Sequence, residues 1–141
     1  MVLKVFTDGG SKGNPGPSSI GVVGYLDGKR VFEFKKSIGT ATNNDAEYKA
    51  LINALEILNP KSQVSNKFQS PNFQNIKKIE FYSDSRLMVN QVKGLFKVKK
   101  GKIKEYILKI RSLEMEIGLP IFYFYIPREK NSVADNLVNS I

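Results

Sequence analysis

Neither cysteine nor histidine occurs anywhere in this chain. The absence of cysteine excludes disulfide bonds, thiolate metal sites and cysteine nucleophiles. The absence of histidine excludes imidazole metal ligands, histidine general bases and every serine–histidine triad. Any catalysis in this chain must therefore depend on carboxylates, lysines, hydroxyl groups or a hard metal ion.

Long hydrophobic runs are also missing. A membrane-spanning helix needs about 18 or more apolar residues in a row, and no stretch of the sequence approaches that length. The first six residues, MVLKVF, are too short for the hydrophobic region of a secretory signal. We therefore expect a cytoplasmic protein that has no membrane partner.

Basic residues outnumber acidic ones. The 141 residues include 22 Lys and Arg against 13 Asp and Glu, which gives a formal net charge of +9. This balance favours a polyanionic partner, because clustered cations release counterions from nucleic-acid phosphates. The length suits one domain with its own hydrophobic core, so we expect residues 1–141 to form a single domain.

Alternating and β-branched residues indicate five strands. Asp27 and Gly28 form a strong hairpin signal between the second strand and the third, so the first three strands are expected to form an antiparallel meander. The aromatic run of the fifth strand predicts burial on both faces. The expected strands cover residues 2–7, 18–26, 30–38, 76–83 and 120–126.

Apolar residues at spacings of three and four indicate four helices. Ser85 is expected to cap the short second helix, and Gly118 to end the third. Residues 59–75 are rich in Asn, Gln, Ser and Lys and predict a long polar surface loop. The expected helices cover residues 44–59, 86–93, 102–117 and 132–141.

This order of elements predicts an α/β fold. Three strands come first, and crossover connections through helices bring the fourth and fifth strands beside them. The expected result is a mixed sheet that is covered by helices.

Four acidic residues fall at the ends of the expected elements. Asp8 and Asp84 end the first and fourth strands, and parallel pairing of those strands would bring both to one edge of the sheet. Glu47 and Asp135 lie in the first turns of two helices. Three of these acids have a named structural alternative: Asp8 as a turn former, Glu47 as the partner of Asn44 in a helix cap, and Asp135 as an acid that complements the helix dipole.

Convergence of the four acids favours a metal site over these alternatives. Clustered like charges repel, and they need either protonation or cations. With oxygen donors alone, Mg²⁺ or Mn²⁺ fits better than zinc. A cluster of this kind can hold two ions for an in-line phosphoryl displacement.

Four motifs carry a resemblance to a known family. In chain order they are FTDGGSKGNPG (6–16), TNNDAEYKAL (42–51), YSDSRLMVNQVKG (82–94) and PREKNSVAD (127–135). They resemble the successive motifs of type 1 ribonuclease H, and the resemblance covers about residues 3–139. It implies a ribonuclease H-like fold with a five-stranded mixed sheet in the order 3-2-1-4-5. It also implies a metal-dependent endonuclease that cuts the RNA strand of RNA/DNA hybrids.

The resemblance carries the family's four metal ligands onto Asp8, Glu47, Asp84 and Asp135. By similarity to the family, Asp8 bridges two Mg²⁺ ions, for which Mn²⁺ can substitute. Glu47 and Asp84 would bind the ion that activates water, and Asp135 the ion near the leaving oxygen. The products would carry 5′-phosphate and 3′-hydroxyl ends.

The resemblance also implies contacts to the substrate. Glycines in residues 9–16 let the backbone approach a ligand where a Cβ would collide. Close backbone groups can hydrogen-bond the 2′-hydroxyl that distinguishes RNA from DNA. The expected contacts are Gly9, Ser11, Gly13, Asn14, Thr42, Asn43, Asn44, Ser85, Lys97, Lys99 and Lys100.

Some of these residues have two interpretations. Asn43 and Asn44 can cap the first helix and also contact bases or sugars, while Thr42 is placed at a phosphate of the DNA strand. Residues 93–104 hold six lysines. They form either a solvated charged face or, as we expect, a strip that follows the phosphates of the hybrid.

The sequence departs from the family pattern in the loop before Asp135. Many members have a histidine there, whereas this chain offers Arg128 and Glu129 as candidates for its place. Arg128 resembles the arginine of histidine-lacking archaeal and bacterial relatives, which can also cut double-stranded RNA. Arginine has a pKa above about 12 and does not readily act as a base. We therefore expect Arg128 to stabilise a phosphate. We also expect a form without an N-terminal hybrid-binding module that acts as a monomer.

Overall fold

A mixed five-stranded sheet runs through the centre of the fold. The computed structural model describes residues 1–61, 75–98 and 101–140. The strands pair in the order β3-β2-β1-β4-β5, which confirms the order that the sequence resemblance implied. β2 pairs antiparallel with both β1 and β3, whereas β4 pairs parallel with both β1 and β5. The strands are β1 (Val2–Ser11), β2 (Gly16–Leu26), β3 (Lys29–Ala41), β4 (Lys78–Ser83) and β5 (Ile121–Tyr125).

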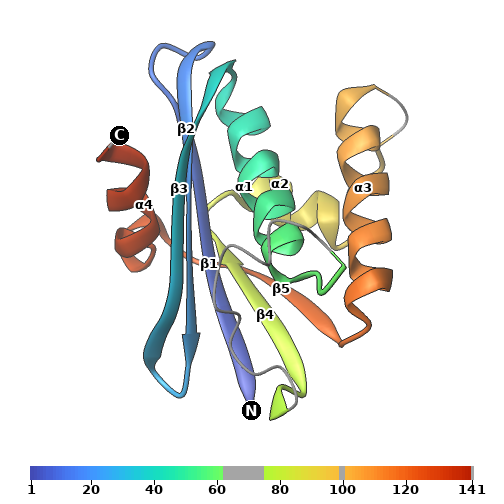
Figure 1. Cartoon of the computed structure of the whole chain (residues 1–141). Helices are drawn as coiled ribbons and strands as arrows, with labels where there is room; N and C mark the ends of the chain where they lie inside the picture. Colours follow the sequence, from blue (N-terminus) through green and yellow to red (C-terminus); the bar gives the residue numbers. More distant parts are fainter. Residues whose placement is uncertain (62–74, 99–100, 141) are drawn as a thin grey trace.

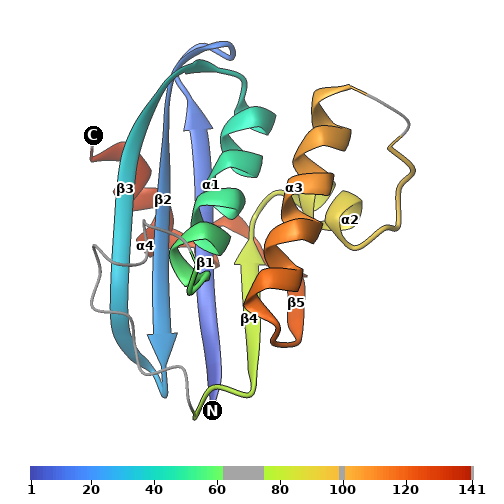
Figure 2. The same ribbon diagram turned by 45° about the vertical axis from the view of Figure 1, so that its right-hand side comes forward.

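Helices cover both faces of the sheet. Figures 1 and 2 show α1, α2 and α3 on one face and α4 on the other. The helices of the described residues are α1 (Asn43–Leu58), α2 (Arg86–Val92), α3 (Lys102–Ile117), the short 3-10 helix η3 (Arg128–Lys130) and α4 (Ser132–Asn139). Most of the predicted loop at 59–75 lies outside the described residues. Over residues 1–61, 75–98 and 101–140, no helix combines the length and apolar character needed to cross a membrane.

Local sequence signals set several element boundaries as expected. Asp27 and Gly28 both have positive φ, 51° and 77°, as a two-residue hairpin turn requires. The backbone N–H of Met88 donates to Ser85 Oγ at 3.2 Å, so Ser85 caps α2. α3 ends at Gly118, which has φ of 74° in the left-handed region.

The hydrophobic core lies between α1 and the sheet. Leu3 and Val5 of β1 are fully buried there, together with Leu51 and Leu55 of α1. Burial of such aliphatic side chains stabilises a fold by about 1.5–3 kcal/mol each. Burial of these side chains therefore holds α1 along its length against the middle of the sheet.

Two adjacent glycines in β1 place the two helical layers. An ideal Cβ on Gly9 would lie 2.2 Å from the backbone oxygen of Ala46 in α1. An ideal Cβ on Gly10 would lie 3.4 Å from a methyl group of Val138 in α4. Because successive residues of a strand face opposite sides of the sheet, α1 and α4 pack on opposite faces.

The first strand is longer than the sequence predicted. β1 continues through Asp8 to Ser11, because residues 8–11 remain paired with β2 although their pairing with β4 has ended. The last parallel pair is Thr7 with Ser83. Asp8 therefore lies at the end of the parallel ladder rather than at the end of the strand.

The prediction that the fifth strand is buried on both faces is wrong. Phe122 and Phe124 of β5 are 45% and 38% exposed, and only Tyr123 of this strand is buried. Packed layers bury the faces of a strand, and α4 packs mainly on β1 and β2 rather than over β5 at the edge of the sheet. The exposed rings pack against the adjacent strand instead, as Phe124 does against Tyr82 with ring centroids 5.3 Å apart.

The close contact at Gly9 predicts a large effect of adding a single methyl group. We expect Gly9→Ala to lower the free energy of unfolding by about 3 kcal/mol, because the new Cβ meets backbone that cannot rotate away. Gly10→Ala is the matched control, since its Cβ meets only a side-chain methyl, and we expect a change below about 1 kcal/mol. Urea unfolding of both variants measures the difference, and equal losses would contradict the prediction.

Candidate active site

Three carboxylates from three different elements meet beside the end of the β1–β4 ladder. Asp8 belongs to β1, Asp84 directly follows β4, and Glu47 lies in α1. One carboxylate oxygen from each lies within 4.8 Å of the others. We call these three residues the acidic cluster. Parallel pairing of β1 with β4 brings Asp8 and Asp84 together, as the sequence predicted.

Glu47 reaches the cluster because α1 passes so close to β1. The backbone N–H of Gly9 donates to Glu47 Oε1 at 2.8 Å. This bond crosses the contact where Gly9 lies against the backbone of Ala46. The alternative in which Glu47 pairs with Asn44 in a helix cap is therefore wrong, since α1 is capped by Thr42, whose Oγ1 accepts from the N–H of Asp45 at 3.1 Å.

Asp135 and Arg128 lie at the same cavity as the acidic cluster. The cavity has a volume of about 460 Å³. Asp135 occupies the first turn of α4, and Arg128 Nη2 donates to Asp135 Oδ1 at 3.4 Å. All four predicted carboxylates and the predicted arginine thus line one cavity.

The protein's own groups compensate the charge of the acidic cluster only in part. Asp8 and Glu47 are 6% and 8% exposed. Burial, followed by the charges of Asp84 and Asp135, raises the pKa of Asp8 to about 8, and Arg128 opposes this rise. Burial and the charges of Asp8 and Asp84 also raise the pKa of Glu47, against the hydrogen bond from Gly9. The cluster therefore favours either bound protons or a bound cation.

The donor set fits a hard divalent cation. Every ligand atom in the cluster is a carboxylate oxygen, and the chain contains no histidine or cysteine that would favour zinc. Oxygen-only sites suit Mg²⁺ and Mn²⁺. Asp8, Glu47 and Asp84 can therefore hold a metal ion, with Asp135 at the same cavity.

Only some of the predicted substrate residues line the cavity. Gly9, Ser11 and Asn43 line the cavity. The others among the described residues do not line it: Gly13, Asn14, Thr42, Asn44, Ser85 and Lys97. Lys99 and Lys100 lie outside the described residues.

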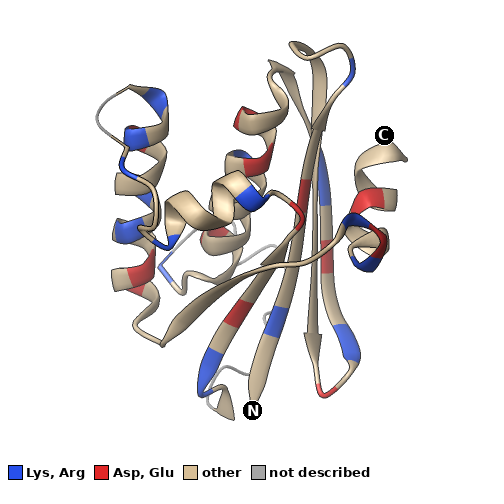
Figure 3. Cartoon of the chain, turned by 180° about the vertical axis from the view of Figure 1, so that it is seen from behind, with Lys and Arg blue, Asp and Glu red and all other residues tan. Residues whose placement is uncertain are grey.

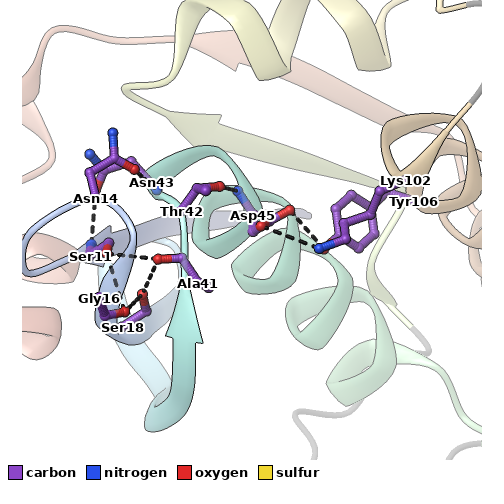
Figure 4. A network of polar contacts seen from close by, with 10 residues as sticks. All are labelled: Ser11, Asn14, Gly16, Ser18, Ala41, Thr42, Asn43, Asp45, Lys102 and Tyr106. Carbon is purple, nitrogen blue, oxygen red and sulfur yellow. Dashed lines mark hydrogen bonds and ion pairs between the residues drawn. The ribbon is translucent and has the colours of Figure 1, made fainter.

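Residues 11–16 are tied to the start of α1 by two asparagines (Figure 4). The backbone N–H of Ser11 donates to Asn43 Oδ1 at 2.8 Å, and the N–H of Asn43 donates to Asn14 Oδ1 at 2.8 Å. Asn14 thus supports Asn43 from outside the cavity. The prediction that Asn43 or Asn44 caps α1 is wrong, because Thr42 does so.

Two glycines of this segment have a packing role that the sequence did not predict. At Gly9 a Cβ would collide with α1, and at Gly16 it would lie 1.8 Å from the backbone oxygen of Lys12. Both glycines therefore permit close approach of the chain to itself, and the contact of Gly9 with a ligand stays a prediction. Gly13 has φ of 91°, a conformation that glycine adopts without strain.

Sequence reasoning missed Asn131 as part of the site. This side chain is buried, and its Nδ2 donates to the carbonyl oxygen of Thr7 at 2.9 Å and to Asp84 Oδ2 at 3.4 Å. From its position directly before α4, Asn131 would be read as a helix cap. It forms no side-chain cap bond and turns toward the acidic cluster instead. Only the contact between α4 and the sheet reveals this role.

Fold and site together define a class of protein. The strand order, the helices on both faces and the carboxylate cluster beside the parallel pair describe an α/β domain with a cluster of oxygen ligands that can hold a divalent metal ion. A family model described as RNase H matches residues 2–116. The chain belongs to the RNase H family, and the relatives below support its type 1 branch.

Named relatives agree with this assignment. The chain is 35% identical over 139 residues to "Ribonuclease HI" of Halobacterium salinarum, covering 97% of this chain and 62% of that protein. It is 34% identical over 141 residues to "Bifunctional protein Rv2228c" of Mycobacterium tuberculosis, covering 99% of this chain and 35% of that protein. The chain thus spans about a third of one relative and less than two thirds of the other.

A solved structure matches over almost the full length. The crystal structure of LC11-RNase H1 in complex with an RNA/DNA hybrid superposes with a TM-score of 0.83 at 41% identity. The match covers 98% of this chain and 94% of that chain. The fold is therefore shared well beyond the neighbourhood of the acidic cluster.

The raised pKa of Asp8 predicts how stability depends on pH without metal. Between the ordinary pKa of 3.8 and about 8, the folded state holds a proton that the unfolded state has lost. The free energy of unfolding therefore falls as the pH rises through this window, by up to about 1.4 kcal/mol per pH unit. Urea unfolding in EDTA from pH 4 to pH 8 measures the slope.

Two comparisons test the assignment of this slope. Asp8→Asn should make it shallower, whereas Asp27→Asn, in the exposed β2–β3 turn, should leave it unchanged. Adding Mg²⁺ at pH 8 should stabilise the natural protein by mass action. A slope that survives Asp8→Asn undiminished would show that the acidic cluster is not its source.

Proposed function

We propose that this chain is an endoribonuclease that hydrolyses the RNA strand of RNA/DNA hybrids, with residues 1–141 acting as one ribonuclease H domain. The observation that carries the proposal is the acidic cluster of Asp8, Glu47 and Asp84, which lies beside the parallel strands of a ribonuclease H fold, with Asp8 and Glu47 buried. The similarity to LC11-RNase H1, a protein captured with such a hybrid, supports this substrate. We propose that it acts as a monomer in the cytoplasm, and both points stay predictions.

The proposed cofactor is a pair of Mg²⁺ ions, for which Mn²⁺ can substitute. Asp8, Glu47, Asp84 and Asp135 are the proposed ligands, because all four line one cavity. When bound, such ions lower the pKa of water and neutralise charge that develops on the phosphate and the leaving oxygen. The proposed products carry 5′-phosphate and 3′-hydroxyl ends.

The chain's own residues hold the ligands in place. The N–H of Gly9 fixes one oxygen of Glu47, which leaves the other oxygen available to the cavity. Asn131 donates to Asp84 from a buried position. These bonds orient two carboxylates before any ligand arrives, so less conformational entropy is lost when one binds.

Arg128 is proposed to contact a phosphate of the RNA strand. Its guanidinium lies at the cavity, next to Asp135, and its side chain is 76% exposed. A guanidinium stays protonated and can donate two parallel hydrogen bonds to phosphate oxygens. Arg128 therefore supplies positive charge at the point where the cleaved phosphate would gain negative charge.

Selection of RNA is proposed to depend on Ser11 and Asn43. Both line the cavity next to the acidic cluster, and their mutual hydrogen bond fixes the backbone there. Fixed polar groups at this place can contact the 2′-hydroxyl of a ribonucleotide. Gly9, Gly13, Asn14, Thr42, Asn44 and Ser85 remain proposed contacts that surround this pair.

Lysines are proposed to bind the phosphates of the hybrid away from the cut. Figure 3 shows Lys and Arg on α3 and on the segment that leads into it. Lys97 of this segment is exposed. Such cations bind phosphates without reading sequence and make the affinity depend on salt.

A cleavage assay tests the proposed activity directly. With Mg²⁺ or Mn²⁺, the natural protein should cut an end-labelled RNA strand within a hybrid, and Asp8→Asn should lower kcat by about a thousandfold or more, because it removes a metal ligand. Asp27→Asn is the matched control, since it makes the same chemical change at an exposed turn. It should retain full activity.

Assays with other nucleic acids, run beside the hybrid, show which substrates the protein cuts. Double-stranded RNA is the second substrate to test, because the chain lacks histidine as some relatives that cut it do. Double-stranded DNA is the negative control. Binding of the hybrid without cleavage by either ion would overturn the proposed activity and leave a binding protein.

Salt dependence of hybrid binding tests the lysines. We expect Lys97→Gln, on the Asp8→Asn background that binds without cutting, to weaken binding about threefold and to reduce the slope of log K against log salt by about 1. Lys29→Gln, in the β2–β3 hairpin, removes the same charge far from the proposed interface. Fluorescence anisotropy at several salt concentrations measures both. Equal effects of the two substitutions would mean that Lys97 makes no phosphate contact.

A further inference from the structure

The first turn of α1 makes contacts on the side away from the acidic cluster. Figure 4 shows Asp45, two residues before Glu47, directed toward Lys102 and Tyr106 at the start of α3. Asp45 Oδ1 accepts from the hydroxyl of Tyr106 at 3.1 Å. Asp45 Oδ2 lies 3.5 Å from Lys102 Nζ. We call Asp45, Lys102 and Tyr106 the α1–α3 clamp.

The groups of the clamp are suited to hold one another. The side chain of Asp45 is only 14% exposed. Burial alone would raise the pKa of Asp45, but hydrogen bonds from Thr42 and Tyr106 and the charge of Lys102 lower it overall. Burial and the neighbouring Asp45 raise the pKa of Tyr106 to about 12. At neutral pH Asp45 is therefore an anion, and the hydroxyl of Tyr106 remains a donor.

Aromatic contacts stiffen the same connection. The ring of Tyr106 stacks on that of Tyr48, with centroids 5.2 Å apart and an interplanar angle of 18°. Tyr48 is fully buried and directly follows Glu47 in α1, and its hydroxyl donates to Gln91 Oε1 of α2 at 2.6 Å. The turn that carries Glu47 is thus tied to both α2 and α3.

The opposite side of this turn holds the segment at residues 11–16. Asn43 accepts from the N–H of Ser11 and donates to Asn14, as described above. The start of α1 therefore lies between that segment and the start of α3 (Figure 4). A duplex that contacts residues 11–16 and also the lysines near α3 must match the spacing that this turn imposes.

We propose that Asp45 is a substrate-positioning residue that sets the spacing between the acidic cluster and the lysines at the start of α3. It does so by holding Lys102 and Tyr106 against the turn that carries Glu47. A hybrid bound through its phosphates at α3 then presents its RNA strand to the carboxylates. This inference rests on the proposed function, because it assumes that the hybrid is the substrate.

Charge alone predicts the opposite effect of losing Asp45. A carboxylate near the binding surface repels the polyanionic hybrid, so neutralising it should strengthen binding. Loss of positioning should weaken binding, because the lysines are no longer held in register with the cavity. The sign of the change in KM therefore separates a positioning role from a purely electrostatic one.

The test compares steady-state hybrid cleavage by Asp45→Asn and Glu105→Gln. Glu105 is an exposed acid in the first turn of α3, so its substitution removes the same charge while the hydrogen bond and the ion pair of the clamp remain. We expect Asp45→Asn to raise KM about three- to tenfold and to change kcat by less than about twofold. Glu105→Gln should leave KM unchanged or lower it.

A second variant distinguishes loss of the clamp from a general loss of structure. Tyr106→Phe keeps the stacked ring and removes only the hydroxyl that donates to Asp45, so it should raise KM by a smaller factor. Combined with Asp45→Asn it should add little, because both substitutions break the same contact. Thermal unfolding of each variant shows whether the fold is intact.

The outcomes separate this inference from the proposed function. If the natural protein cuts hybrids and Asp45→Asn has a KM equal to or below that of Glu105→Gln, the positioning role is wrong and the activity stands. If the natural protein binds hybrids but does not cut them, the proposed activity is wrong, and the positioning role stands only if Asp45→Asn has a higher Kd by anisotropy than Glu105→Gln. If it does not bind hybrids at all, both the function and the clamp are overturned.

Discussion

The approach of α1 to β1 at Gly9 is the constraint on which the rest of the site depends. The two backbones lie so close that no side chain fits between them. This proximity lets the N–H of Gly9 hold Glu47 beside Asp8, although the two acids belong to different elements. It also places the first turn of α1 where Asn43 reaches residues 11–16 on one side and Asp45 reaches α3 on the other. A shift of α1 would therefore disturb every one of these contacts.

Charge is distributed in two opposing ways. The chain as a whole is strongly basic, yet its cavity concentrates acids that burial keeps from being screened by water. Burial and mutual repulsion raise the pKa values of Asp8 and Glu47, so the ionised cluster is costly without a cation. A bound metal ion would relieve this cost and would also attract a phosphate that the bare acids repel. In the proposed function, the basic surface gathers the hybrid and the metal makes the acidic cavity accessible to it.

Much of the fold and the core of the candidate site could be predicted from the sequence. Local signals such as Gly118 after α3 and the turn at Asp27 place element boundaries, because they depend only on backbone conformation. The four motifs place the acids at the ends of elements. Parallel pairing of β1 with β4 then brings Asp8 and Asp84 together. The sequence was a poor guide where the environment of a residue depends on elements far away in the chain. Burial of β5 depends on which helices cover its two faces, and the packing role of Gly9, which the sequence did not predict, depends on α1. Asn131 donates a hydrogen bond to Asp84 only because α4 packs on the sheet.

The sequence by itself determined the chemistry that is available: oxygen ligands only, a basic surface for a polyanion, and an α/β order of elements with acids at their ends. These properties follow from composition and from periodicity along the chain. Only the tertiary structure decided how closely the acids meet, which of them are buried away from water, and which polar side chains orient them. Distances between residues far apart in the chain arise from packing. The buried bond from Gly9 to Glu47 and the clamp from Asp45 to α3 therefore cannot be read from local sequence.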